Sequence, residues 1–312
     1  MTRILITGAN GMIGRALLAQ MSPDQLAQCT ASDLTADALP DGVDFRRLDV
    51  TGDDPETVIA DVKPEVVVHL ASIVTPPPGL GRETAFNVDV TGTQNVLNAC
   101  LKHSVRRLVV TSSGAAYGYH KDNSVPLRES DACRGNPEFA YADHKRQVEE
   151  MLAKARDEHP DLEQVVLRVG TVLGVGTRNQ ITALFHRPRL LAVQGSDSPF
   201  VFIWTRDLAN ILLRAATNGP AGIYNVAGDG ALSVDMLARA LNKPVLRLPS
   251  WALKAALAVA KPLGLTQYGP EQVRFLQYRP VLANDALKAD FGYMPEKTSA
   301  EVFDLWRESE GL

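Results

Sequence analysis

Short aliphatic runs alternate with amphipathic segments along most of this chain. The runs at 65–71 and 107–111 are dominated by aliphatic residues, which is typical of strands buried on both faces of a parallel sheet. The alternation of strands and helices predicts an α/β fold with a doubly wound parallel sheet between two layers of helices. Strands are predicted at 3–7, 28–33, 43–48, 65–70, 106–112, 164–169 and 244–248, and helices near 12–21, 55–61, 83–103, 139–159, 206–217, 233–241 and 299–310.

The pattern becomes less regular after about residue 170, where prolines and glycines are frequent. We therefore expect a sheet domain at 1–170 and, at 171–312, mainly a smaller substrate-binding lobe interleaved with the last strands. An apolar segment at 251–260 predicts a helix in this lobe. We interpret it as part of the core or as a lid over a hydrophobic substrate. A peripheral membrane contact is the weaker alternative, because Lys254 and Lys261 give the segment little basic character.

The first predicted strand runs directly into a glycine turn that opens a helix. Gly8, Gly11 and Gly14 are spaced G-x-x-G-x-x-G, which suits a tight turn, close approach of a pyrophosphate and packing of helix on strand. The helix N-terminus offers unpaired N–H groups to the phosphates. These features predict a Rossmann-type, dinucleotide-binding first domain that also carries the catalytic residues.

An acidic residue at the end of the second predicted strand indicates which dinucleotide is bound. Asp33 follows the last glycine of the turn by 19 residues. Its carboxylate can accept hydrogen bonds from the adenosine ribose and would repel the 2′-phosphate of NADP. The expected cofactor is therefore NAD, with NADP disfavoured.

Composition argues against several other classes of protein. The 312 residues carry a net charge of −4, which argues against nucleic acid or an anionic membrane as a principal partner. No signal peptide precedes the first strand, and no apolar run approaches the ~18 residues of a membrane span. Cys29, Cys100 and Cys133 lack metal-binding spacing and are expected to be reduced. We expect a cytoplasmic protein with a small-molecule substrate and no metal site.

Three residues predict the chemistry. Ser113 ends the fifth predicted strand, and ligands of open α/β sheets bind beyond the carboxyl ends of the strands. Tyr141 and Lys145 lie four residues apart on one face of a predicted helix. A lysine ammonium on that face favours the phenolate, whose pKa is ordinarily ~10. We expect Ser113 to bind the substrate oxygen, Tyr141 to act as acid and base, and Lys145 to lower the pKa of Tyr141 and hold the nicotinamide ribose.

Taken together, these motifs resemble the extended short-chain dehydrogenase/reductases, the NAD-dependent epimerase/dehydratase family. The resemblance covers nearly the whole chain, and its matching segments are 7–14, 33, 48–50, 69–71, 92–97, 111–118, 141–145 and 167–170. It implies that Asp49 and Val50 contact the adenine and that Leu70 and Ala71 line the cofactor. It also implies a homodimer through the helices near 83–103 and 139–159. The expected cofactor-binding residues are Gly8, Asn10, Gly11, Met12, Ile13, Gly14, Asp33, Leu34, Asp49, Val50, Leu70, Ala71, Thr111, Tyr141 and Lys145.

Several positions depart from the sugar-nucleotide enzymes that this family contains. Thr171 stands where they usually have an asparagine, and Phe200 stands where they usually have an arginine that pairs with the diphosphate. Without a guanidinium a diphosphate is poorly held. Asp89 also replaces a usual asparagine, for which Asn87 is only a weak substitute.

The expected function is therefore NAD-dependent transfer of hydride between a secondary alcohol and a ketone on an apolar small molecule. The candidate substrate residues are Ser113, Thr171, Phe200 and Trp204. Two alternatives stay open. A sugar-nucleotide epimerase would use the same serine, tyrosine and lysine, and a catalytically silent NAD-binding regulator would need only the cofactor site. His69 is expected to be a packed strand histidine.

Overall fold

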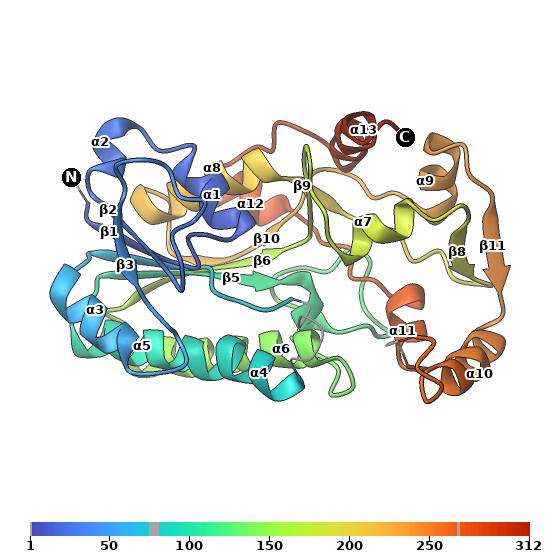
Figure 1. Ribbon diagram of the computed structural model, residues 1–312, viewed down its shortest axis with the longest axis horizontal. Helices are drawn as coiled ribbons and strands as arrows, with labels where there is room; N and C mark the ends of the chain where they lie inside the picture. Colours follow the sequence, from blue (N-terminus) through green and yellow to red (C-terminus); the bar gives the residue numbers. More distant parts are fainter. Residues whose placement is uncertain (1, 75–80, 267–268) are drawn as a thin grey trace.

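A parallel seven-stranded sheet organises the molecule (Figure 1). The computed structural model describes residues 2–74, 81–266 and 269–312. The strand order is β10-β6-β5-β4-β1-β2-β3, so the chain reverses direction across the sheet between β1 and β4. The strands are β1 (Ile4–Thr7), β2 (Cys29–Asp33), β3 (Asp44–Arg47), β4 (Val66–His69), β5 (Arg107–Ser113), β6 (Glu163–Val169) and β10 (Gly222–Val226).

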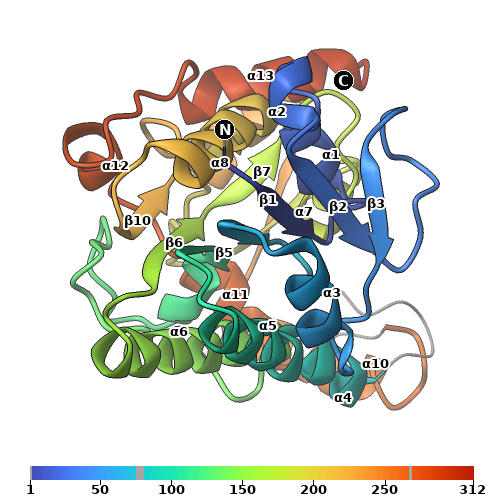
Figure 2. The ribbon, with the colours of Figure 1, turned by 90° about the vertical axis from the view of Figure 1, so that its left-hand side faces the viewer.

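Helices cover both faces of this sheet, as Figures 1 and 2 show. On one face lie α3 (Asp54–Val62), α4 (Arg82–Phe86), α5 (Gly92–Lys102) and α6 (Ala140–Glu158). On the other lie α1 (Met12–Leu18), α2 (Pro23–Leu26), α8 (Thr205–Thr217) and α12 (Asp285–Ala289). The long helix predicted at 83–103 is interrupted by a π-helical turn, Asn87–Thr91. The doubly wound fold predicted from the sequence is confirmed.

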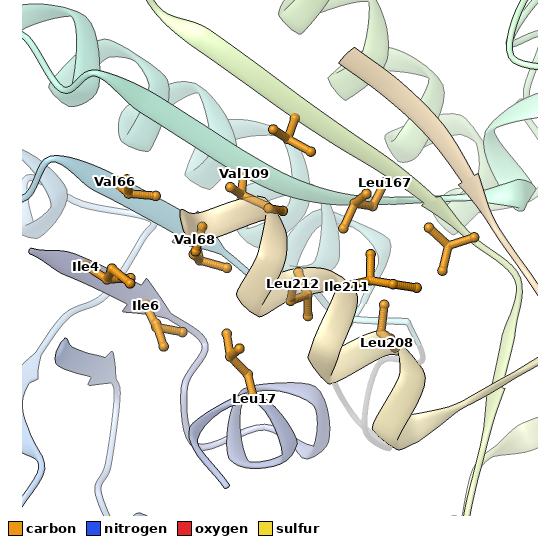
Figure 3. Close-up of a cluster of buried hydrophobic side chains, with 14 of the residues drawn as sticks. Ile4, Ile6, Leu17, Val66, Val68, Val109, Leu167, Leu208, Ile211 and Leu212 are labelled. Carbon is orange, nitrogen blue, oxygen red and sulfur yellow. The ribbon is translucent and has the colours of Figure 1, made fainter. Parts of the chain in front are cut away.

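Side chains of successive strand residues point to opposite faces, which explains why the strands are apolar throughout. Ile4 and Ile6 belong to the core beneath α1 and α8, whereas Leu5 belongs to the core beneath α3, α5 and α6. Figure 3 shows the first of these cores, where Leu212 and its neighbours on α8 reach the strands. Each face of the sheet therefore packs against its own hydrophobic core.

The C-terminal part adds two small parallel sheets and its own aromatic core. One sheet pairs β7 (Thr171–Leu173) with β9 (Phe202–Trp204), and the other pairs β8 (Leu190–Val193) with β11 (Val245–Leu248). The predicted strand at 244–248 therefore exists but lies outside the main sheet, whose seventh strand is β10. The remaining elements are a 3-10 turn (Gly114–Tyr117), α7 (Gln180–Phe185), α9 (Val234–Ala240), α10 (Ser250–Ala260), α11 (Gln272–Gln277) and α13 (Ser299–Ser309).

The helix predicted at 251–260 is present as α10, but it is not a core helix. Of its side chains only Leu253 is buried, while Trp251 is 72% exposed. The expectation of core packing is wrong, because the helix rests on the molecule through one narrow edge. Within the described residues, no helix is both long and apolar enough to cross a membrane.

Two tryptophans of this part make a matched test of the packing. Trp306 is fully buried against Phe185 and Phe303 and donates its indole N–H to the carbonyl of Thr177 at 3.1 Å. Trp306→Ala should lower the free energy of unfolding by about 3–5 kcal/mol, through lost burial and the cavity left behind. Trp251→Ala should change it by no more than about 0.5 kcal/mol. Urea unfolding of both variants measures this, and equal effects would contradict the packing described.

Candidate active site

The glycine turn after β1 leaves no room for side chains at two of its positions. Gly8 has φ +71°, and a Cβ there would lie 2.6 Å from the backbone N of Ala71. A Cβ on Gly14 would lie 2.5 Å from the carbonyl oxygen of Ala9. Gly11 is the N-cap residue before α1, and no side chain of the described residues caps the helix there. The backbone N–H groups of the first turn are therefore available to a ligand. This cradle fits the pyrophosphate of a dinucleotide.

Asp33 ends β2 next to this turn, as predicted. Its Oδ2 accepts the backbone N–H of Asn10 at 2.9 Å, and its Oδ1 accepts the N–H of Leu34 at 2.7 Å. Asn10 in turn donates to the hydroxyl of Thr35 at 3.1 Å. The carboxylate is thus fixed at the edge where β1 and β2 end, and its remaining lone pairs are available to ribose hydroxyls.

Hydrogen bonds also hold the loop after β3, where the adenine is expected to bind. Asp49 accepts the backbone N–H of Thr51 at 2.9 Å, and this hydrogen bond is the main reason why its pKa is lowered. The carbonyl of Val50 accepts a hydrogen bond from the Asn95 amide at 2.9 Å. The loop after β3 is therefore tied to α5. Because the strands are parallel, this loop and the loop after β4 both lie at the carboxyl end of the sheet.

A buried polar chain supports the loop after β4, where Leu70 and Ala71 lie. The Thr7 hydroxyl is 2.7 Å from His69 Nδ1, and His69 Nε2 is 3.0 Å from the Thr93 hydroxyl. Thr93 donates to the carbonyl of Asp89 at 2.6 Å, so its oxygen accepts from His69 Nε2–H. Burial lowers the pKa of His69 to about 3, which keeps the ring neutral. The reading of His69 as a packed strand histidine fits this arrangement.

The structure brings the serine, tyrosine and lysine of the predicted catalytic set together. Ser113 is the last residue of β5, and its hydroxyl oxygen accepts the N–H of Ala115 at 3.1 Å. Tyr141 and Lys145 lie on the first turns of α6, with Lys145 Nζ 5.6 Å from the tyrosine ring centre. Lys145 donates to the carbonyl of Thr111 at 2.9 Å. Strand β5 thus aligns all three.

The electrostatics of Tyr141 differ from the expectation. Burial raises its pKa to about 12, a hydrogen bond from Ser113 lowers it, and the charge of Asp89 raises it further. Burial also lowers the pKa of Lys145. The lysine ammonium is directed to the backbone of Thr111 rather than to the phenol oxygen, so it does not dominate the pKa of Tyr141 in this geometry.

A buried ion pair joins α6 to β6. Arg168 on β6 donates from Nε and Nη2 to the two carboxylate oxygens of Glu149 on α6, at 2.9 and 3.0 Å. Its Nη1 donates to the Tyr117 hydroxyl at 2.8 Å. Burial opposes the charge of Arg168, but Glu149 outweighs it and raises the pKa. The bidentate pair sets the position of α6, the helix that carries Tyr141 and Lys145.

The candidate substrate residues Thr171, Phe200 and Trp204 are placed differently from one another. Thr171 pairs with Phe202 in the small β7–β9 sheet. Phe200 is only 4% exposed and stacks on Phe202 in the aromatic core. Trp204 lines a cavity of about 430 Å³ beside α1, a cavity that the catalytic serine, tyrosine and lysine do not line. The structure therefore does not gather this set around Tyr141.

Sequence reasoning missed Arg279. Its guanidinium carbon lies 3.8 Å from the ring centre of Phe200 and 4.9 Å from that of Phe275, and Nη1 donates to the carbonyl of Ser198 at 2.7 Å. Its Nε is buried without a hydrogen-bond partner among the described residues. Burial lowers its pKa to about 9, partly offset by Tyr119, so the group stays charged at neutral pH.

Tyr119 lies between this arginine and Tyr141. Its ring lies 5.3 Å from that of Phe275 and 4.9 Å from that of Phe139, the residue that precedes α6. The charge of Tyr141 contributes to the raised pKa of Tyr119. No sequence pattern marks this cluster, because Arg279 and Ser198 are 81 residues apart. The C-terminal segment around Arg279 also carries Glu271 and Arg274, so the charge of Arg279 gives no signal of its own in the sequence.

The sheet order and the glycine turn define the class of this molecule, a Rossmann-type dinucleotide-binding protein. Residues 4–227 match the NAD dependent epimerase/dehydratase family. The chain belongs to this family, which confirms the predicted resemblance and NAD as the cofactor.

Relatives and solved structures agree with this assignment. The chain is 31% identical over 222 residues to the decarboxylating sterol-4-alpha-carboxylate 3-dehydrogenase of Saccharomyces cerevisiae, covering 65% of this chain and 60% of that protein. It is 30% identical over 216 residues to a UDP-glucose 4-epimerase of Azospirillum brasilense, covering 62% and 60%. The fold is similar to that of a Thermotoga maritima UDP-glucose 4-epimerase, with a TM-score of 0.75, 18% identity and coverage of 99% and 98%.

Two glycines with positive φ test the cradle. Gly8→Ala should weaken NAD binding at least about tenfold, since its methyl group would collide with the backbone of the β4 loop. Gly230 has φ +78° with nothing within 4 Å of its Cβ position, so Gly230→Ala adds the same backbone strain without the collision. Calorimetric titration with NAD should therefore show weaker binding for the first variant alone. Equal losses in both variants would show that strain, and not the cradle, is responsible.

Proposed function

We propose that this protein is an NAD-dependent oxidoreductase that moves hydride between a secondary alcohol and a ketone. The observation that carries the proposal is the alignment of Ser113, Tyr141 and Lys145 at the carboxyl end of β5, beside the glycine cradle. When bound there, NAD accepts or delivers the hydride. Gly8, Gly14 and Asp33 would hold it, together with the loops after β3 and β4. A homodimer and a cytoplasmic location stay predictions, as does the division at residue 170.

The chain's own groups supply the proton chemistry. The oxygen of Ser113 accepts the N–H of Ala115, and its hydrogen is directed to the Tyr141 oxygen, with the carbonyl of Val169 3.5 Å away. A bound substrate oxygen would replace these acceptors of the Ser113 hydroxyl. Tyr141, with a pKa of about 12, holds its proton at neutral pH and is ready to give it to a developing alkoxide. Lys145, anchored on Thr111, is placed to hold the nicotinamide ribose. This charge state favours ketone reduction at neutral pH, whereas alcohol oxidation needs the phenolate.

The substrate proposed here combines an apolar body with an anionic group. Arg279 carries a charge that the described carboxylates leave unpaired, on an aromatic platform that includes Phe200 and Phe275. A guanidinium in this setting binds carboxylates and phosphates strongly. Both named relatives have anionic groups in the compounds of their names, a sterol carboxylate and UDP-glucose. A carboxylated or phosphorylated ketone therefore suits the site better than the neutral apolar one expected from sequence.

Tyr141→Phe tests the reaction directly. The substitution keeps the ring and removes the ionisable oxygen, so turnover should fall by at least about a hundredfold while NAD affinity stays near that of the wild type. For the wild-type protein, alcohol oxidation should accelerate as pH rises, because deprotonation of Tyr141 precedes it, and ketone reduction should decline over the same range. Turnover near the wild-type level in Tyr141→Phe would refute the role of this residue.

Arg279→Gln tests the anionic group. Thermal shifts in the presence of NAD would compare a sterol carboxylate, UDP-glucose and a neutral ketosteroid. We expect an anionic compound to stabilise the wild type, and Arg279→Gln to weaken that binding at least about tenfold. Arg274→Gln is the control, because Arg274 is half-exposed and pairs with Glu138 at 2.9 Å.

The pattern of binding and turnover also separates the alternatives. Binding of the neutral ketone alone, with unchanged affinity in Arg279→Gln, would contradict the proposed anionic group of the substrate. Binding of UDP-glucose without net oxidation of the cofactor would favour an epimerase. Binding of NAD with no turnover of any compound would favour the silent regulator.

A further inference from the structure

Asp89 is a buried carboxylate on the π-helical turn that separates α4 from α5. Its side chain is fully buried, and it accepts three hydrogen bonds from neighbouring elements. Oδ1 accepts the Ser72 hydroxyl and the backbone N–H of Ile73, both at 2.8 Å, and Oδ2 lies 3.0 Å from His144 Nδ1. A buried carboxylate needs such partners. π-turns of this kind occur frequently at functional sites.

The partners of Asp89 belong to the two halves of the candidate active site. Ser72 and Ile73 directly follow the residues expected to line the cofactor, in the loop after β4. His144 lies on α6 immediately before Lys145, in the turn that begins with Tyr141. One side chain therefore joins the cofactor loop to the catalytic turn. Asn87, the weak substitute considered from the sequence, is exposed and joins neither.

The hydrogen bond between Asp89 and His144 orients the imidazole ring. A carboxylate only accepts, so His144 Nδ1 carries the hydrogen of this bond. His144 Nε2 is buried without a partner among the described residues, and the ring edge packs against Phe86, with ring centres 5.5 Å apart. The His144 ring is therefore held by its bond to Asp89 on one edge and by an apolar contact with Phe86 on the other.

The negative charge of Asp89 affects the pKa values of the groups around Tyr141. It raises the pKa of Tyr141, after burial and against the hydrogen bond from Ser113, and it also raises that of Lys145. The other ionisable groups that face the tyrosine are Lys145, 5.6 Å from its ring centre, and Tyr119. Glu149 adds a second negative charge near Lys145, but it is paired with an arginine. Asp89 has no such cation of its own among the described residues.

We propose that Asp89 is a positioning residue that ties the cofactor loop to the catalytic turn and places a buried carboxylate behind that turn. The proposal rests on the proposed function for its reaction. An asparagine, which the family resemblance places at this position, can keep the bonds to Ser72 and Ile73 through its carbonyl oxygen. Its amide can donate to His144 once the ring hydrogen moves to Nε2, but it carries no charge.

Two substitutions separate the tether from the charge. Asp89→Asn keeps the shape and the bonds to Ser72 and Ile73 and removes the charge, whereas Asp89→Ala removes the bonds and the charge. Asp143→Asn is the matched control, because it deletes a charge on the same turn that Arg82 and Arg146 already compensate, at 3.1 and 3.0 Å. Should the alanine variant fail to fold, Ser72→Ala removes one bond of the tether in its place.

Two measurements on the full chain require no substrate. Calorimetry gives the Kd for NAD, and the carbon-13 shift of tyrosine Cζ in the NAD complex gives the titration of Tyr141, assigned with Tyr141→Phe. We expect Asp89→Asn to keep the Kd within about twofold and to lower the Tyr141 midpoint by at least about half a pH unit. Asp89→Ala should raise the Kd at least about fivefold. Asp143→Asn should change neither.

Each outcome decides one part of the proposal. A Tyr141 midpoint in Asp89→Asn equal to that of the wild type would overturn the role of the charge. An unchanged Kd in Asp89→Ala, or in Ser72→Ala if that variant replaces it, would overturn the tether. Neither readout depends on turnover. Failure to find a substrate would therefore count against the proposed function only, and the two measurements would still decide this inference.

Discussion

The contact between two stretches of backbone, at Gly8 and at Ala71, constrains the rest of the site. Leu70 donates its N–H to the carbonyl of Thr7 at 3.0 Å, and the turn that follows has no space for a side chain. The ends of β1 and β4 are thereby held at a fixed separation. This is the point where the strand order reverses, and such a point opens the crevice in which α/β proteins bind ligands. Every other feature of the site is arranged around the two loops that meet here.

The catalytic helix is positioned against this crevice by charges rather than by apolar packing alone. Glu149 meets Arg168 on the side of β6, and His144 meets Asp89 on the side of α5. A buried charge is costly without its partner, so each pair tolerates only a narrow range of helix positions. The two pairs lie on successive turns of α6 and hold it at both. Aliphatic contacts would permit small rotations that these hydrogen bonds do not, and the geometry of Tyr141 depends on that difference.

The features that sequence predicted are those whose parts lie close together along the chain. The glycine turn, the acid at the end of β2 and the spacing of Tyr141 and Lys145 each follow from local geometry. The missed features join distant residues. Asp89 and His144 are 55 residues apart, and the π-turn that directs Asp89 inward leaves no signal in a helical pattern. Arg279 reaches Phe200 only because β11 and α11 lie against β8 and bring the C-terminal segment back to this part of the chain. The exposure of α10 was hidden for a related reason, since apolar composition does not tell what a helix packs against.

The placement of charge across the site has a direction, and this direction bears on the chemistry. Asp89 lies behind the catalytic turn, where its charge opposes ionisation of Tyr141. Arg279 lies at the other end of the aromatic cluster, where Tyr119 separates it from Tyr141. In the proposed function, an anionic substrate would be attracted through its distal group and not through the reacting centre, where a second negative charge would be unfavourable. The ketone oxygen gains its stabilisation from the neutral donors Ser113 and Tyr141, which bind an oxyanion more strongly as it forms than they bind the carbonyl before reaction. Under the proposed function, binding of the anionic group and transfer of the proton therefore depend on different residues, Arg279 and Tyr141, and a ketone would meet Tyr141 in its protonated form.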